Sequence, residues 1–183
     1  MEIVLIRHGQ PTVDKNVKLS ATQFANWLDE YNNSSIVQAN KPPTSLTEKI
    51  SSHFVISSDL PRAINSAKVC VGKKPDLIIK HLKEMPIPHW SLPLITNAYA
   101  WIIINGLMWA IGLHGQVDSL WCCRKRGKLA ARTLSSMAEQ KQNIAVFGHV
   151  IMNYYIALQL VRQGWRANFT GKKFWSSLTL TRQ

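Results

Sequence analysis

Acidic side chains are scarce in this sequence. Its 183 residues include 10 Asp and Glu against 22 Lys and Arg, and the formal net charge is +12 at pH 7. A chain this basic attracts anions, which include phosphorylated metabolites, nucleic acids and acidic lipids. The basic residues are scattered and form no stripe with interleaved aromatic side chains, so a specific nucleic-acid interface is not expected.

Cysteine is also rare. The chain has Cys70, Cys122 and Cys123, and this odd number with an adjacent pair argues against a disulfide framework. No spacing of Cys and His resembles a zinc site, and we expect neither a metal nor another cofactor. Glu2 and Arg7 interrupt the first apolar run, so a signal peptide is not expected. Reduced thiols and a cytoplasmic location are the simplest interpretation.

Short apolar runs alternate with amphipathic stretches along the chain. The patterns predict strands over 2–6, 53–57, 76–79, 143–147 and 174–180, and helices over 21–31, 61–71, 118–140 and 150–163. Strands that alternate with helices are typical of the α/β class. We therefore expect a single domain over 1–183, a three-layer α/β/α sandwich around a mostly parallel sheet.

Four of the predicted strands end in, or are followed by, residues that can carry charge. The first ends in Arg7 and His8, and Arg62 follows the second. His149 follows the fourth strand, and Glu84 follows the third. Because the carboxyl ends of parallel strands meet at one edge of the sheet, where α/β proteins bind ligands, we expect these five side chains to lie together.

The motifs that carry these residues resemble those of the histidine phosphatase superfamily, also called phosphoglycerate mutase-like. The resemblance rests on Leu5–Gly9, Ser57–Ala63, Glu84 and Gly148–His149, in the order found in the family and over the whole length. It implies a phosphate pocket at the sheet edge. It also implies a small helical cap insertion, which we place at about 85–117.

The residue types fit phosphoryl transfer on physical grounds. The transferred group needs positive charge around its oxygens. Arg7 and Arg62 offer forked donors that match phosphate geometry, and His149, when protonated, adds a third donor. A neutral nitrogen of His8 can attack phosphorus and form a phosphohistidine, provided that a hydrogen bond holds the other ring nitrogen. Similar proteins use a backbone carbonyl for that bond.

The leaving oxygen needs a proton, and Glu84 is the candidate acid. This role requires a raised pKa, which neighbouring apolar residues and the phosphate charge can provide. The same carboxylate could then activate water. Asp76, Glu48 and Asp118 are the alternatives for this role, because the position of the acid varies most between similar proteins.

The loop after the first strand departs from the family pattern. Family members often carry an Asn that touches phosphate a few residues after Arg-His-Gly, and here Gln10 or Asn16 could take its place. The usual Leu-Thr-x-x-Gly before the second strand is reduced to a segment without glycine, Leu46–Lys49. These changes leave the phosphate pocket intact and put the identity of the substrate in question.

Residues 85–117 contain no charged side chain, and Ala98–Leu113 is almost wholly apolar. This run is shorter than the ~20 residues that span a bilayer, and a single crossing would separate Arg7 and Arg62 from His149. A buried or cap helix beside the site is therefore expected. Such a cap could form a substrate wall, a dimer contact or a patch on a membrane surface.

The sequence favours a metal-independent phosphatase that hydrolyses a small phosphomonoester. The chain is shorter than typical glycolytic mutases, which carry extra elements. Three alternatives remain open at this point. A phosphomutase or a protein phosphohistidine phosphatase would use the same site, a non-catalytic module would only hold an anionic partner, and nucleic-acid binding would depend steeply on salt.

Overall fold

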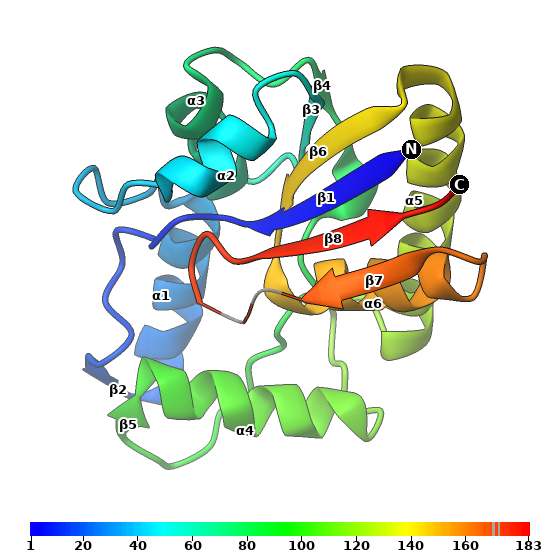
Figure 1. Cartoon of the computed structure of the whole chain (residues 1–183). Coiled ribbons are helices and arrows are strands. Elements are labelled where there is room, and N and C mark those ends of the chain that lie inside the picture. Colours follow the sequence, from blue (N-terminus) through cyan, green and yellow to red (C-terminus); the bar gives the residue numbers. More distant parts are fainter. Residues whose placement is uncertain (170, 172) are drawn as a thin grey trace.

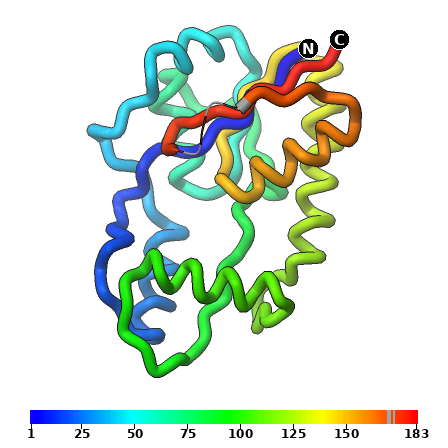
Figure 2. The backbone as a smooth tube through the Cα atoms, turned by 60° about the horizontal axis from the view of Figure 1, so that its bottom comes forward, coloured from blue at the N-terminus to red at the C-terminus, as the bar shows by residue number. Residues whose placement is uncertain are grey.

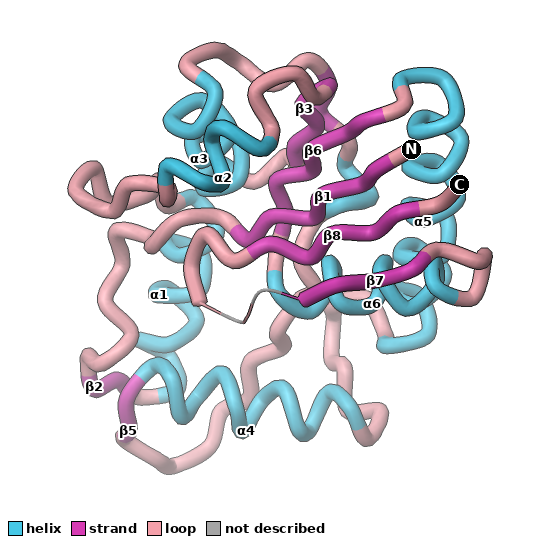
Figure 3. The backbone as a smooth tube through the Cα atoms, viewed as in Figure 1, coloured by secondary structure: helices cyan, strands magenta, loops and turns pink. Residues whose placement is uncertain are grey.

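The computed structural model describes residues 1–169, 171 and 173–183, and it confirms the predicted α/β class. A six-stranded sheet crosses the molecule (Figures 1 and 3), in the order β4-β3-β6-β1-β8-β7. The first four strands run parallel, β8 is antiparallel to β1, and β7 is antiparallel to β8. The strands are β1 (Glu2–Arg7), β3 (Phe54–Ser57), β4 (Leu77–Ile78), β6 (Asn143–Gly148), β7 (Arg166–Phe169) and β8 (Ser177–Thr181).

Helices cover both faces of the sheet, which gives the predicted three layers. Ile3 and Leu5 point into a core shared with α5 and α6, while Val4 and Ile6 point into a core shared with α2 and α3. A strand buried on both faces must be apolar at consecutive positions, as β1 is. The helices of these layers are α2 (Thr44–Lys49), α3 (Pro61–Val71), α5 (Leu120–Lys141) and α6 (Val150–Val161).

The strands that carry the candidate residues are direct neighbours. In the parallel pair of β1 and β6, Arg7 lies opposite Gly148, and in the pair of β3 and β6, Ser57 lies opposite Phe147. The three strands therefore end at the same edge, as predicted. The loops that follow them begin side by side.

A separate group of helices and short strands lies beside this edge and below the sheet in Figures 1 and 2. It consists of α1 (Ala21–Asn33), α4 (Ala98–Ala110) and the pair of short strands β2 (Lys18–Leu19) and β5 (Thr96–Asn97). Phe24 stacks on Trp27 and on Trp101, with ring centroids 5.8 and 5.6 Å apart. This group thus has its own small aromatic core. In the described part of the chain, no helix is both long and apolar enough to cross a bilayer.

Some local predictions were wrong. No helix was predicted between the helices 21–31 and 61–71, but α2 lies there and buries Leu46 against the sheet. β7 was not predicted either. The helix predicted over 61–71 does begin at Pro61, and its N-cap is Leu60, which makes no side-chain cap hydrogen bond. The last strand begins at Ser177 and not at Phe174.

Candidate active site

The shared edge of β1, β3 and β6 brings the predicted residues together. The rings of His8 and His149 lie with their centroids 5.2 Å apart. Both histidines and Arg62 are almost completely buried, with 3%, 0% and 1% of their surfaces exposed. Arg62 and Glu84 line one cavity of about 420 Å³, together with Tyr31, Ile87, Asp118 and Arg126, whereas His8 and His149 are not among its lining residues.

The ring of His8 is held in one tautomer. Its Nδ1 lies 2.7 Å from the carbonyl oxygen of Gly9. Since a carbonyl only accepts, Nδ1 carries the proton and Nε2 keeps its lone pair. The turn itself is tightly packed, because a Cβ on Gly9 would lie 2.5 Å from the ring of Trp175 and the Gly9 N–H donates to Ser66 Oγ at 2.9 Å. Gly9 is therefore required at this position.

The surroundings of His8 keep the ring neutral. Burial lowers its pKa from 6.5 to about 3, and the charges of Arg62, Arg7 and Lys15 act in the same direction. The bond to Gly9 opposes the shift only in part. A neutral imidazole with a free Nε2 lone pair is the form that can act as a nucleophile at neutral pH.

This burial predicts a pH dependence of stability. Between pH 6.5 and about 3 the unfolded chain binds a proton at His8 that the folded chain does not. Stability therefore falls as the pH falls through this window, by about 1.4 kcal/mol per pH unit for one such histidine. We expect a shallower loss for His8→Gln than for the wild type in urea unfolding between pH 6.5 and 4. The exposed His81→Gln should keep the wild-type slope, and equal slopes in all three proteins would contradict the prediction.

Arg62 is a buried cation without a carboxylate partner among the described residues. One terminal nitrogen donates to the carbonyl oxygen of Tyr31 at 3.0 Å, and the guanidinium lies 4.5 Å from the centre of the Tyr31 ring. Its Nε is buried and has no partner in the described part of the chain. Burial lowers the pKa of Arg62. Glu84 opposes this shift only in part. A buried guanidinium without an ion-pair partner is costly for the fold, and an anionic ligand would neutralise it.

His149 has one nitrogen engaged and one available. Its Nε2 lies 2.9 Å from Ser58 Oγ, which also accepts from the N–H of Leu60 at 3.3 Å. If the Ser58 hydroxyl donates to Nε2, the neutral ring carries its proton on Nδ1, and Nδ1 has no partner among the described residues. Burial lowers the pKa of His149 well below 6.5, and the charge of Arg62 adds to this.

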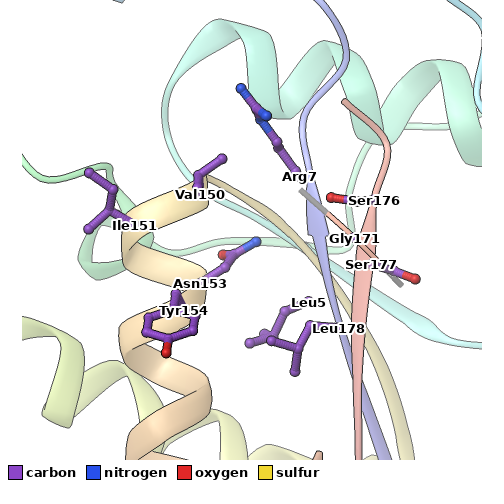
Figure 4. Close-up of a pocket in the computed structure, with 10 residues that line it drawn as sticks. All are labelled: Leu5, Arg7, Val150, Ile151, Asn153, Tyr154, Gly171, Ser176, Ser177 and Leu178. Carbon is purple, nitrogen blue, oxygen red and sulfur yellow. The ribbon is translucent and has the colours of Figure 1, made fainter. Parts of the chain in front are cut away.

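Arg7 ends β1 with its guanidinium 4.3 Å from the centre of the Phe174 ring. It also lines a second cavity of about 310 Å³ between α6 and β8. Figure 4 shows the Arg7 side chain pointing away from Leu5 and Leu178, which lie in the apolar part of that cavity. The charge of Arg7 is therefore directed away from the apolar end of this second cavity.

Glu84 is held by the backbone at the start of α6. Its Oε1 accepts from the N–H groups of Met152 and Met85, both at 3.0 Å, and its Oε2 accepts from Ile151 at 3.3 Å. These bonds favour the carboxylate, but burial is the larger effect and raises the pKa of Glu84. The loop itself is held from α5, where Arg126 donates to the carbonyl oxygens of three of its residues, His81, Lys83 and Glu84.

No family model and no curated protein matches this sequence. Solved structures do match. A phosphoserine phosphatase from Entamoeba histolytica is 18% identical with a TM-score of 0.58, over 100% of this chain and 98% of that chain. A phosphoglycerate mutase from Bacillus anthracis is 15% identical with a TM-score of 0.61, over 98% and 86%. The ecdysone phosphate phosphatase from Bombix mori is 11% identical with a TM-score of 0.57, over 100% and 92%.

The chain has the histidine phosphatase fold. The resemblance predicted from four short motifs is thus confirmed at the level of the fold.

Within this fold the rival acids lie in different places. Asp76 accepts from the Val55 N–H at 2.8 Å and pairs with Lys73 at 2.8 Å, at the start of β3 and away from the site edge. Glu48 is exposed on α2, while Asp118 lines the same cavity as Glu84. Of the four acids, only Glu84 is bound to the first turn of α6, which follows His149 directly.

The two candidates from the loop after β1 lie at the surface. Gln10 and Asn16 are both exposed, and neither lines the cavity beside Arg62 and Glu84. Their backbone N–H groups donate to Asn40 Oδ1 and Asp14 Oδ1, so the interactions described for them belong to the shape of the loop.

Several residues of the site were not predicted from the sequence. Tyr31 stacks on Arg62, Ser58 binds His149, and Arg126 holds the Glu84 loop. Ser58 belongs to the Ser57–Ala63 motif and could have been found there. Tyr31 and Arg126 are separated from Arg62 by 31 and 64 positions in the sequence, and no local pattern marks them.

Proposed function

We propose that this chain is a phosphatase that hydrolyses a small phosphomonoester through a phosphohistidine on His8. The observation that carries the proposal is the hydrogen bond from His8 Nδ1 to the Gly9 carbonyl, which leaves Nε2 as the nucleophile. The buried charge of Arg62, which has no ion-pair partner among the described residues and is offset by Glu84 only in part, supports it, because a phosphate dianion would supply further negative charge.

In the first half-reaction, His8 Nε2 forms a bond to phosphorus as the bond to the leaving oxygen breaks. Arg7 and Arg62 neutralise the equatorial oxygens of the phosphoryl group, and Nδ1–H of His149 donates to one of them. The leaving oxygen takes the proton of Glu84, whose raised pKa makes it available as an acid. The alcohol then departs.

In the second half-reaction, a water molecule attacks the phosphorus of phospho-His8. The Glu84 carboxylate accepts a proton from this water, the bond between phosphorus and Nε2 breaks, and inorganic phosphate leaves. His8 returns to its neutral form and Glu84 to its acid form. The two arginines supply the positive charge and His149 a neutral N–H donor, and the proposal includes no metal or cofactor.

The cavity and the neighbours support the proposed substrate class. The cavity beside Glu84 has about 420 Å³, which suits a small leaving group. The neighbours include a phosphoserine phosphatase solved with 3-phosphoglyceric acid and an ecdysone phosphate phosphatase. Their substrates are of different kinds, and the feature common to them is the phosphomonoester. We therefore assign the substrate by that group alone.

The experiment is incubation of the protein with a ³²P-labelled aryl phosphate, followed by a quench in detergent at alkaline pH. We expect a phosphoenzyme that is labile in acid and stable in alkali, as a phosphohistidine is, and that disappears in His8→Ala. If a broad panel of phosphorylated metabolites gave neither turnover nor a phosphoenzyme, the chain would be a non-catalytic anion-binding module.

A phosphomutase is the second candidate, because one neighbour is a phosphoglycerate mutase. The two functions share the first half-reaction and differ in the acceptor. A chase of the labelled phosphoenzyme with phosphoglycerate or a sugar phosphate separates them. Transfer of the label to the added acceptor would identify a mutase, whereas release as inorganic phosphate supports the phosphatase.

The acid role of Glu84 predicts a dependence on the leaving group. Glu84→Gln keeps the size of the side chain and removes the proton, so turnover of an alkyl phosphate should fall by about 100-fold or more. Turnover of p-nitrophenyl phosphate should fall much less, because that leaving group needs little protonation. Steady-state rates with both substrates test this, with the exposed Glu48→Gln as control. Equal losses with both substrates would count against the acid role.

A further inference from the structure

The outer side of α4 is a continuous apolar stripe. Tyr99, Ile103, Leu107 and Ile111 follow one another at intervals of four residues and are 57%, 45%, 64% and 79% exposed. Side chains at this interval lie one above the other on a helix. Together with Ile95, which is 73% exposed just before the helix, these residues form what we call the α4 face.

The opposite side of α4 is already used. Trp101 is fully buried against α1, and its Nε1 donates to the carbonyl oxygen of Leu19 at 2.8 Å. Trp109 is buried too, and its Nε1 donates to the carbonyl oxygen of Asp118 at 2.8 Å. The helix is therefore apolar on both sides while only one side is covered. A helix that is apolar all round is found where both sides are buried, so the α4 face lacks its partner.

The chain that follows the α4 face carries mostly positive charge. From Met85 to Ala138 the only acidic residue is Asp118. Arg124, Lys125 and Lys128 are exposed on the first turns of α5, which begins where the loop after α4 ends (Figure 2). Trp121, 65% exposed on the same turn, lies under the Lys125 ammonium at 4.5 Å.

We propose that the α4 face and the first turns of α5 dock on an anionic lipid surface. Apolar side chains, exposed Tyr and Trp, and neighbouring cations are the combination that binds the boundary between lipid headgroups and acyl chains. A second copy of the chain fits the charges poorly, because it would bring together two molecules of net charge +12. The proposal does not depend on the phosphatase activity.

The apolar half of the proposal is tested by sedimentation of the full-length protein with vesicles. We expect binding to phosphatidylcholine vesicles that contain phosphatidylserine, and at least a tenfold weaker binding for the double variant Ile103→Gln, Leu107→Gln. The matched control is Leu158→Gln, Val161→Gln, which removes similar exposed side chains from α6. Equal loss in both double variants would overturn the proposal, as would no binding by the wild type.

The charge half is tested by Arg124→Gln, Lys125→Gln. This variant should weaken binding to the anionic vesicles several-fold and lose most of the salt dependence. Lys68→Gln, Lys74→Gln is the control, because these lysines lie on or just after α3, at the opposite end of the molecule from α4 in Figure 1. A dimer in analytical ultracentrifugation that Ile103→Gln, Leu107→Gln abolishes, without vesicle binding, would assign the α4 face to a second copy and overturn the lipid proposal.

Discussion

Replacing His8 by alanine should reduce the turnover of p-nitrophenyl phosphate by about 10⁴-fold or more, the scale of loss when an enzyme nucleophile is removed. His8 is the residue whose Nδ1 is fixed by Gly9 and whose Nε2 is left with a lone pair. Its removal also takes away the site of the covalent intermediate. Steady-state kinetics and phosphoenzyme trapping measure the two effects separately.

The control for His8→Ala is His53→Ala. His53 precedes β3 at the opposite edge of the sheet and pairs with Glu2 at 3.0 Å. We expect it to keep nearly wild-type turnover. The His8→Ala protein should still bind inorganic phosphate, because Arg7, Arg62 and His149 remain. Turnover near the wild-type rate in His8→Ala would show that the mechanism is wrong.

The second large effect is expected for Arg62→Met, which keeps much of the side-chain volume and removes the charge. We expect kcat/KM to fall by about 10³-fold, the upper range for loss of one group that stabilises a transition-state oxyanion. Arg62→Lys should recover only part of this, because an ammonium lacks the planar fork. Kinetics with an aryl phosphate at several phosphate concentrations measure catalysis and product inhibition together.

Stability should move in the opposite direction. Arg62 is 1% exposed and has no carboxylate partner among the described residues, so its burial opposes folding. We expect the midpoint of thermal unfolding of Arg62→Met to stay equal to that of the wild type or to rise. The exposed Arg132→Met on α5 should change neither property. A large loss of stability with unchanged activity would place Arg62 in the structural framework and not in the site.

The features that were predictable from sequence are local or periodic. Alternation of apolar runs with amphipathic stretches gave the order of the main elements, and the strand ends gave the shared edge. The capping box at the start of α1 was also readable, because Ser20 and Gln23 satisfy each other's backbone N–H groups within one turn.

The features that sequence did not reveal depend on contacts between distant segments. The α2 helix is only six residues long and is stabilised by packing of Leu46 and Ile50 on the sheet. β7 exists by pairing with β8 alone. Likewise, the sequence around Ser58 gives no sign of its contact with His149, which lies 91 positions further along the chain. Local propensity contains no information on such partners.

The hydrogen bonds of Glu84 link the proposed chemistry to the position of α6. Its carboxyl oxygens hold the N–H groups of Ile151 and Met152, in the turn that follows His149. A carboxylate is a stronger acceptor than a carboxylic acid. In the proposed reaction, the hydrogen bonds from α6 to Glu84 therefore become stronger when the proton leaves with the alcohol. They become weaker again when water returns the proton. We therefore expect the first turn of α6 to be held more firmly in the phosphorylated protein. The carboxylate that holds it is the same group that takes the proton from water.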